Sequence, residues 1–222
     1  MTQSITNFKN KSHMNSLILL RHGQSQWNLE NRFTGWKDVP LTEKGIEEAN
    51  KAGLLIKESK IKIDIIFSSI LQRANRTAEL ALKEKDFAHL WKDNQLIMTK
   101  SQNLNERDYG DLVGLNKEET SQKFGKDQVH IWRRSYDVSP PGGESLKNVV
   151  DRVGPYFEKF IQPHLFSDKN VIIVAHGNSL RATMIKIGLY KPEEISKIEL
   201  PTGSPFVINF SSGKLQDANY LN

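Results

Sequence analysis

One stretch of the chain sets the architecture: Leu17-Ile18-Leu19-Leu20-Arg21-His22-Gly23. Its apolar run ends abruptly in charged and polar residues, which predicts a buried strand whose C-terminal end opens into a loop. A second stretch, Val171-Ile172-Ile173-Val174-Ala175-His176-Gly177, has the same pattern. Because functional crevices of α/β sheets lie at the carboxyl ends of their strands, we expect His22 and His176 to face one cleft.

The rest of the chain is expected to alternate strands and helices. The predicted strands are 17–20, 63–67, 96–98, 171–175 and 206–210. The predicted helices are one that follows Thr42 and those at 71–82, 117–124, 128–136, 144–160 and 179–187. This alternation predicts an α/β fold with a mainly parallel sheet and helices on both faces.

The 222 residues are expected to form a single domain at 15–222 behind a flexible N-terminal leader, 1–14. The leader contains no acidic residue and no periodic apolar pattern. The composition, 37% hydrophobic and 26% charged, is that of an ordinary globular domain.

Composition also limits the class of function. Without cysteine, the chain has no disulfide, no thiolate metal site and no cysteine nucleophile. No apolar stretch is long enough to span a bilayer, and the polar N-terminus lacks the apolar core of a secretory signal, so we expect a cytoplasmic protein. The net charge of +5 is spread without a long basic run, which favours small anionic partners over nucleic acid or membrane.

Two of the six histidines stand out, because only His22 and His176 follow a predicted strand and precede a glycine. Glycine lets a ligand approach the backbone closely. We interpret the other four as ordinary surface or core residues: His13, His89, His130 and His164.

Arginines occupy similar positions. Arg21 adjoins the first of these histidines, and Arg73 follows the second predicted strand. Arg133 and Arg134 share a later helix. A planar guanidinium group donates two parallel hydrogen bonds and therefore suits phosphate. Arg181, one turn into a predicted helix, is expected to be a surface residue that pairs with a neighbouring carboxylate.

Several blocks of sequence carry a more specific signal. They are LLRHGQSQWN (19–28), NRFTGW (31–36), LNERDYG (104–110), GLNK (114–117), WRR (132–134), AHGNSLR (175–181) and PTG (201–203). In this order they resemble the 2,3-bisphosphoglycerate-dependent phosphoglycerate mutases of the histidine phosphatase superfamily. The resemblance runs from Leu17 to Phe210.

The resemblance implies a role for each catalytic residue. His22 would attack phosphorus through one ring nitrogen, while a backbone carbonyl accepts a hydrogen bond from the other. Arg21, Arg73 and a protonated His176 would stabilise negative charge on the transferring group. Glu106 would act as general acid and base, with its pKa raised toward neutrality.

The same resemblance implies the substrate contacts and the cofactor. One cradle would hold the transferred phosphoryl group and a second would hold the fixed end of a phosphoglycerate. The cofactor 2,3-bisphosphoglycerate would prime the enzyme, no metal would be needed, and a homodimer is suggested. The implied substrate-binding residues, besides Arg21, Arg73 and Glu106, are Gly23, Gln24, Ser25, Asn28, Thr34, Gly35, Arg107, Tyr109, Lys117, Arg133, Arg134, Gly177 and Asn178.

The chain departs from that pattern in two places. Asp108 stands where many members carry histidine, which is expected to alter a side contact and not the reaction. Longer mutases carry an extended segment, whereas this chain passes directly from Pro141 through two glycines. Because that segment helps to cover the site, we expect thinner protection from water and a side hydrolysis of bisphosphoglycerate, unless the C-terminal tail, 211–222, closes over the cleft.

Two other interpretations stay open. A phosphatase of the same superfamily would need His22, Arg21, Arg73 and His176 but not the second cradle. The residues that weigh against it are Arg133, Arg134, Lys117 and the block Phe33-Thr34-Gly35-Trp36. A noncatalytic phospholigand-binding or scaffold protein on the same fold is expected to have lost the histidine or the acid, and both are present here.

Overall fold

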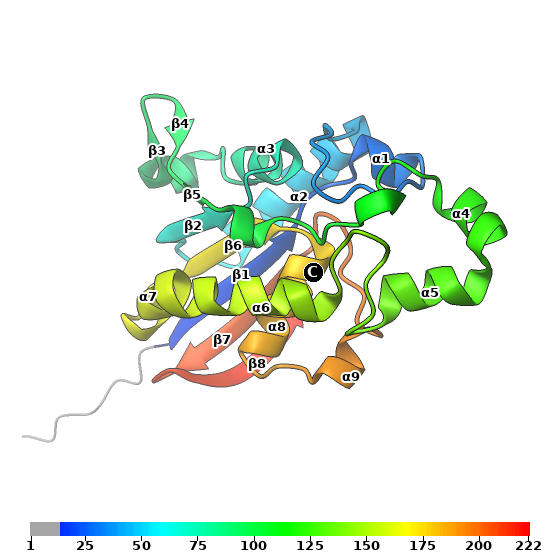
Figure 1. The fold of residues 1–222 in the computed structure, drawn as a ribbon. Coiled ribbons are helices and arrows are strands. Elements are labelled where there is room, and N and C mark those ends of the chain that lie inside the picture. The colour runs from blue at the N-terminus through cyan, green and yellow to red at the C-terminus, as the bar shows by residue number, and fades with distance from the viewer. Residues whose placement is uncertain (1–13) are drawn as a thin grey trace, which may run out of the picture.

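A six-stranded sheet forms the centre of the computed structural model, which describes residues 14–222. Its strands are β1 (Met14–Arg21), β2 (Ile65–Ser68), β5 (Thr99–Lys100), β6 (Val171–Ala175), β7 (Pro205–Ser211) and β8 (Lys214–Tyr220). Their order is β5-β2-β6-β1-β7-β8 (Figure 1). The first four are parallel, whereas β7 and β8 are antiparallel to their neighbours, which confirms the mainly parallel sheet. A separate hairpin holds β3 (Trp91–Lys92) and β4 (Gln95–Leu96).

β1 lies in the interior of the sheet, between β6 and β7. Leu17 and Leu19 belong to one hydrophobic core, and Ile18 and Leu20 belong to the other. All four side chains are buried, so the strand is a continuous apolar run and not an alternating one. Parallel pairing aligns the last residues of β1 and β6, and both strands therefore end at the same edge.

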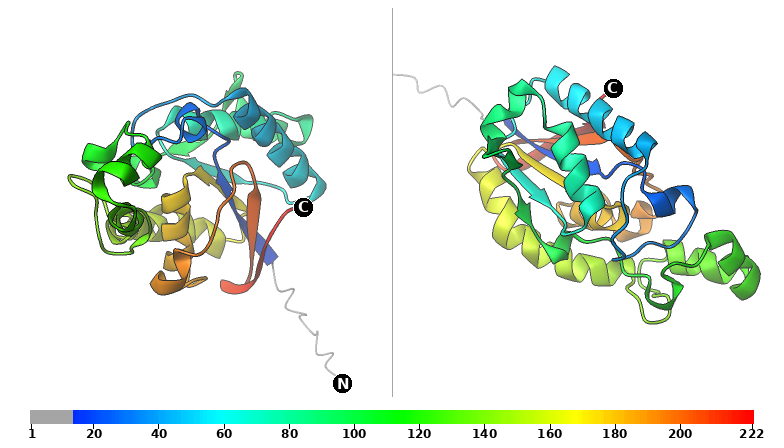
Figure 2. Two further views of the ribbon diagram at one scale, coloured as in Figure 1. Left: turned by 90° about the vertical axis from the view of Figure 1, so that its right-hand side faces the viewer. Right: turned by 90° about the horizontal axis from the view of Figure 1, so that it is seen from above.

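Helices cover both faces of the sheet, as predicted (Figures 1 and 2). One face carries α2 (Glu43–Glu58) and α3 (Gln72–Ala81). The other carries α6 (Leu146–Tyr156), α7 (Gln162–Phe166) and α8 (Gly177–Lys186). The shorter helices are α1 (Gln26–Leu29), α4 (Lys117–Phe124), α5 (Lys126–Arg134) and α9 (Pro192–Ile195). Of these, α4 and α5 project from the body of the molecule beyond the carboxyl edge of β1 (Figure 1).

Most predicted elements match the structure to within two residues at each end. β1 begins earlier than predicted, at Met14, and two other elements differ more. The predicted strand 96–98 is wrong, because the residues that join the sheet after β2 are those of β5. The predicted helix 144–160 begins later, since the Ser145 hydroxyl caps α6 by accepting from the Asn148 N–H. After Pro155, which has no N–H to donate, the helix passes into a π turn, η4 (Phe157–Ile161).

The C-terminal tail forms a strand and does not close over the cleft. Ser212 and Gly213, with φ of 50° and 74°, turn the chain back, and β8 pairs with β7 at the sheet edge. Tyr220 packs against Phe206, with ring centroids 4.8 Å apart. The expected leader, 1–14, lies outside the described residues except for Met14, which begins β1. Within the described residues, no helix has the length and apolar character needed to cross a membrane.

Candidate active site

His22 and His176 meet at the carboxyl edge of the sheet, as predicted. His22 follows β1, His176 follows β6, and their ring centroids are 5.0 Å apart. The His22 N–H donates to the carbonyl of Ala175 at 3.0 Å, which continues the strand pairing up to the histidine. The register of two parallel strands therefore sets the distance between the imidazoles.

The buried His22 ring is held in one orientation. Its Nδ1 lies 2.7 Å from the Gly23 carbonyl oxygen. That oxygen can only accept a hydrogen bond, so Nδ1 carries the proton and Nε2 keeps its lone pair. Burial, and then the charges of Arg73 and Arg21, hold the pKa of His22 well below its ordinary 6.5. The ring is thus neutral, and Nε2 is available as a nucleophile.

His176 is completely buried and is held by Ser69, a residue that sequence analysis missed. Its Nε2 lies 2.7 Å from the Ser69 hydroxyl, which accepts from the Leu71 N–H at 3.2 Å. Burial, and then the charge of Arg73, hold the pKa of His176 well below 6.5. The ring is therefore neutral in this arrangement, and the protonated form expected beside a bound phosphate stays a prediction. The position of Ser69, directly after β2 at the same edge, was the signal that could have found it.

Arg73 and Arg21 approach the histidine pair from different elements. Arg73, on the first turn of α3, donates to two carbonyls of the 35–37 loop at 2.8 and 2.9 Å. Arg21, at the end of β1, donates to the Leu200 carbonyl at 2.7 Å. Among residues 14–222, the Nε atoms of both arginines and Nδ1 of His176 are buried without a hydrogen-bond partner. The two arginine N–H groups are complementary to an anion with several oxygens, and so is Nδ1 of His176 in the tautomer whose Nε2 accepts from the Ser69 hydroxyl.

Glu106 lies among donors and positive charges. Its Oε1 accepts from the Arg107 N–H at 2.7 Å and from the backbone and side-chain amides of Asn178 at 3.1 and 3.0 Å. Burial raises the pKa of Glu106, but the Arg107 N–H, the Asn178 amide and two neighbouring arginines outweigh it. The pKa lies below its ordinary 4.5. The expected shift toward neutrality is therefore wrong for this arrangement, because the carboxylate has three donors.

Two adjoining cavities open at this edge. The first, of about 80 Å³, is lined by Arg21, His22, Asn28, Arg32, Phe33, Thr34, Gly35, Arg73, Glu106, Tyr109 and Lys117. The second, of about 240 Å³, is lined by Arg21, Glu106, Tyr109, Lys117, Arg133, Arg134, Gly177, Asn178, Arg181 and Glu199. They share Arg21, Glu106, Tyr109 and Lys117. Most of the predicted substrate-binding residues line these two basic cavities, whereas His176 lines neither. The division differs from the prediction, because Asn28, Thr34 and Gly35 line the cavity of His22 and Gly177 and Asn178 line the other.

Four predicted substrate-binding residues lie outside both cavities. Gly23 packs so closely against α2 that a Cβ would lie 2.1 Å from a backbone oxygen. The Gln24 N–H donates to a side chain of α2, and Ser25 caps α1. Arg107 is fully buried, and its Nη2 donates to the Tyr109 hydroxyl. These four residues therefore stabilise the loops around the cavities and do not form the cavity walls.

Arg181 lines the second cavity, so the expectation of a surface residue paired with a carboxylate is wrong. Its Nε and Nη2 donate to the Ile198 carbonyl at 3.1 and 2.8 Å. Its Nη1 lies 3.4 Å from the point where a Cβ on Gly177 would stand. Helix position could not reveal this environment, because only the fold brings residue 198 to residue 181. Arg32 and Phe33 also line the first cavity; they belong to the block 31–36 but were not predicted to bind substrate. Glu199, in the second cavity, was missed by the sequence analysis.

The fold and the site define an α/β protein whose sheet edge combines a nucleophilic imidazole with donors suited to phosphate. No group of three or more His, Asp or Glu side chains that could hold a metal ion occurs in the part of the chain that the structure describes. The chain belongs to the histidine phosphatase superfamily (branch 1), whose family model matches residues 17–220.

Two relatives by sequence are named 2,3-bisphosphoglycerate-dependent phosphoglycerate mutase. The protein of Bartonella henselae is 52% identical over 197 residues, which are 89% of this chain and 93% of that protein. The protein of Beijerinckia indica is 52% identical over 191 residues, which are 86% of this chain and 89% of that protein.

The similar solved structures include phosphatases. A mycobacterial glucosyl-3-phosphoglycerate phosphatase in complex with VO3 is 25% identical, with a TM-score of 0.72 over 87% of this chain and 92% of that chain. An alpha-ribazole phosphatase of Shigella flexneri is 24% identical, with a TM-score of 0.75 over 93% of this chain and 96% of that chain. The second likeness concerns the fold alone.

Proposed function

We propose that this protein is a phosphoglycerate mutase that interconverts 3-phosphoglycerate and 2-phosphoglycerate through a phosphohistidine at His22, primed by 2,3-bisphosphoglycerate. The observation that carries the proposal is the pair of adjoining basic cavities with Glu106 in the wall of both. A mutase must hold its substrate by a second anionic group while the phosphoryl group leaves and returns. The 52% identity to proteins named as mutases supports the same reaction.

The residues of the site suit each step of this reaction. Nε2 of His22 forms a bond to phosphorus while the P–O bond of the ester breaks. Arg21 and Arg73 neutralise charge on the transferring oxygens. Glu106 donates a proton to the leaving alkoxide and later takes one from the hydroxyl that receives the phosphoryl group. Since the pKa of Glu106 is low, its acid form depends on bound anions that neutralise the neighbouring arginines and raise that pKa.

A ligand with two phosphate groups fits the donors that are present. The buried and unpartnered Nε atoms of Arg21 and Arg73, with Nδ1 of His176, would hold the group next to the nucleophile. The basic side chains of the second cavity, Arg133 and Arg134 among them, would hold the other group. Bound in this way, 2,3-bisphosphoglycerate would supply the phosphoryl group that primes the enzyme.

A phosphatase of the same superfamily is the second candidate. The 25% identical structure named a phosphatase favours it. Such an enzyme would transfer the phosphoryl group from His22 to water, and the dephosphorylated product would not have to stay bound for a second transfer. The second cavity, which adds Arg133, Arg134 and Arg181 to the first, favours the mutase, because it can retain an anionic product between the two transfers.

Isomerisation and phosphate release separate the candidates. We expect the purified protein, in the presence of a chelator, to convert 3-phosphoglycerate to 2-phosphoglycerate and to be stimulated by 2,3-bisphosphoglycerate. His22→Ala should abolish both this conversion and the trapping of labelled phosphorus on the protein, because no other group replaces Nε2. Phosphate release without isomerisation would establish the phosphatase. Label retained in His22→Ala would remove His22 from its role, and no activity at all would leave a binding protein.

A further inference from the structure

The proposed proton-transfer group, Glu106, lies on a loop between two short turns, η2 (Gln102–Leu104) and η3 (Gly110–Leu112). No helix or strand contains residues 105–109. Proton transfer requires the carboxylate to lie within hydrogen-bond reach of the reacting oxygen, so something must hold this backbone in place. The question is which residues do so.

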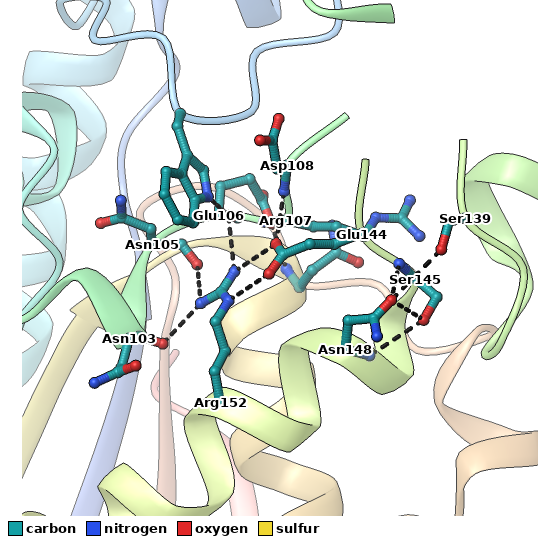
Figure 3. A network of polar contacts seen from close by, with 12 residues as sticks. Asn103, Asn105, Glu106, Arg107, Asp108, Ser139, Glu144, Ser145, Asn148 and Arg152 are labelled. Carbon is teal, nitrogen blue, oxygen red and sulfur yellow. Dashed lines mark hydrogen bonds and ion pairs between the residues drawn. The ribbon is translucent and has the colours of Figure 1, made fainter. Parts of the chain in front are cut away.

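The side chain of Arg152, on α6, donates hydrogen bonds to backbone carbonyls of the loop. Nη1 donates to Asn103 O at 2.8 Å and to Asn105 O at 3.1 Å, and Nη2 donates to Glu106 O at 3.0 Å (Figure 3). The Trp36 indole N–H donates to the same Glu106 carbonyl at 2.6 Å. The Arg152 side chain thus contacts the backbone from Asn103 to Glu106.

Glu144 completes the attachment. Its two oxygens accept from Arg152 Nε at 2.7 Å and from Arg152 Nη2 at 2.9 Å. The same carboxylate accepts from the Asp108 N–H at 2.8 Å, and the Glu144 N–H donates to the Asp108 carbonyl at 2.9 Å. The loop is therefore bound on both sides of Glu106, by Arg152 before it and by Glu144 after it (Figure 3).

All five N–H donors of Arg152 are used within the protein, so none is left for a ligand. A guanidinium group has five N–H donors, and three carbonyls with two carboxylate contacts occupy all five. Its charge is paired with Glu144, and the two side chains are only 16% and 20% exposed. Arg152 lines neither cavity, in contrast to Arg21, Arg73 and Arg181.

We propose that Arg152 and Glu144 are positioning residues that hold Glu106 at the geometry needed for proton transfer. The proposal rests on the acid and base role proposed for Glu106. Loosening the pair would let the carboxylate move while the phosphate-binding arginines stay in place. Because a displacement of about 1 Å can cost about 10²-fold in rate, the loss should be large and confined to the proton-transfer step.

The test compares two phosphate esters as donors to His22 in single-turnover experiments. An aliphatic ester such as 2,3-bisphosphoglycerate releases an alkoxide that needs a proton, whereas 4-nitrophenyl phosphate releases a stable phenolate that does not. In Arg152→Gln, we expect the rate with the aliphatic ester to fall about 10- to 100-fold and the rate with the aryl ester to fall less than about 3-fold. Glu144→Gln, which keeps the shape of the side chain, should show the same pattern with smaller losses of rate.

A matched control and a double variant sharpen the result. Lys147 and Asp151 form an exposed ion pair on the same helix, and Lys147→Ala should change neither rate. In a Glu106→Gln background, adding Arg152→Gln should cost little more with the aliphatic ester, because two residues that act through one group are not additive. This comparison needs the aliphatic ester alone.

Equal losses with both esters, or fully additive losses in the double variant, would overturn the proposal, since either would mean general damage to the phosphate site. If Arg152→Gln does not fold, Arg152→Lys and Glu144→Gln answer the same question. The result is independent of whether the wild-type protein isomerises phosphoglycerates. A phosphatase with Glu106 as its acid would show the same dependence on the leaving group. The isomerisation assay tests the mutase proposal, and the comparison of the two esters tests the role of Arg152 and Glu144.

Discussion

Lys117 carries a positive charge that its surroundings weaken. Burial, and then the charges of Arg133 and Arg21, lower the pKa of Lys117 to about 8. Its ammonium nitrogen lies 5.9 Å from the centroid of the Phe33 ring, and the residue lines both cavities. A side chain that joins the two proposed anion sites therefore loses its charge not far above neutral pH.

We expect kcat/KM for a phosphoglycerate to fall as the pH rises through about 8, because lysine loses its charge above its pKa. Lys117→Arg should move this fall to higher pH, since a guanidinium group stays charged across the range. Profiles of kcat/KM against pH for the two proteins measure the effect. A fall at the same pH in both proteins would assign it to another group.

At the scale of elements, two segments that could have covered the site do not reach it. Segment 139–144 packs against the turn at Gly110, where a Cβ would lie 2.2 Å from the Pro141 carbonyl oxygen. The Asp111 N–H donates to that same carbonyl at 2.9 Å. The C-terminal residues 211–222 continue into β8. No residue of either segment lines the cavities, so the expectation that the tail closes over the cleft is not met.

Under the proposed mechanism, we therefore expect water to reach a phosphorylated His22. We expect slow release of inorganic phosphate from 2,3-bisphosphoglycerate alongside isomerisation, because enzymes normally suppress such side reactions by excluding water. Phosphate assays on the wild-type protein, with His22→Ala as the background, measure it. Release no greater than in that variant would show that the short segment protects the site after all.

At the scale of the whole molecule, two buried histidines make the free energy of unfolding depend on pH. His22 and His176 are buried at the carboxyl edge of the sheet, and burial holds both pKa values well below 6.5. Below pH 6.5 the unfolded chain binds protons that the folded chain does not accept. The free energy of unfolding therefore falls as the pH falls below 6.5, until the lowered pKa values are reached.

Denaturant unfolding at several pH values between 7.5 and 5 should show this loss. Each histidine contributes a slope of up to about 1.4 kcal/mol per pH unit. His22→Gln should reduce the slope, because the unfolded variant no longer binds that proton. A slope that is unchanged in His22→Gln would contradict burial of a neutral ring at this position.

Local pattern was enough for much of this molecule. A doubly buried strand must be an apolar run, so β6 has the predicted bounds 171–175 and β1 contains its predicted run. Helix α4 also matches its prediction, because Asn116 caps it and Gly125 ends it. The meeting of His22 and His176 followed from the general rule that parallel strands share a carboxyl edge.

Long-range contacts produced what local pattern could not. Strand β5 has only two residues, and it forms by pairing with the edge of β2. In the same way, β8 forms by pairing with the edge of β7. Arg181 faces a cavity because residue 198 reaches it, and Arg152 holds Glu106 because α6 packs beneath that loop. The low pKa of Glu106 comes from the N–H of the adjacent Arg107 together with Arg21, Asn178 and Arg73, which only the fold brings near it. Sequence periodicity reports which face of an element is buried, but a donor, a charge or an edge partner from elsewhere in the chain enters only when the elements pack.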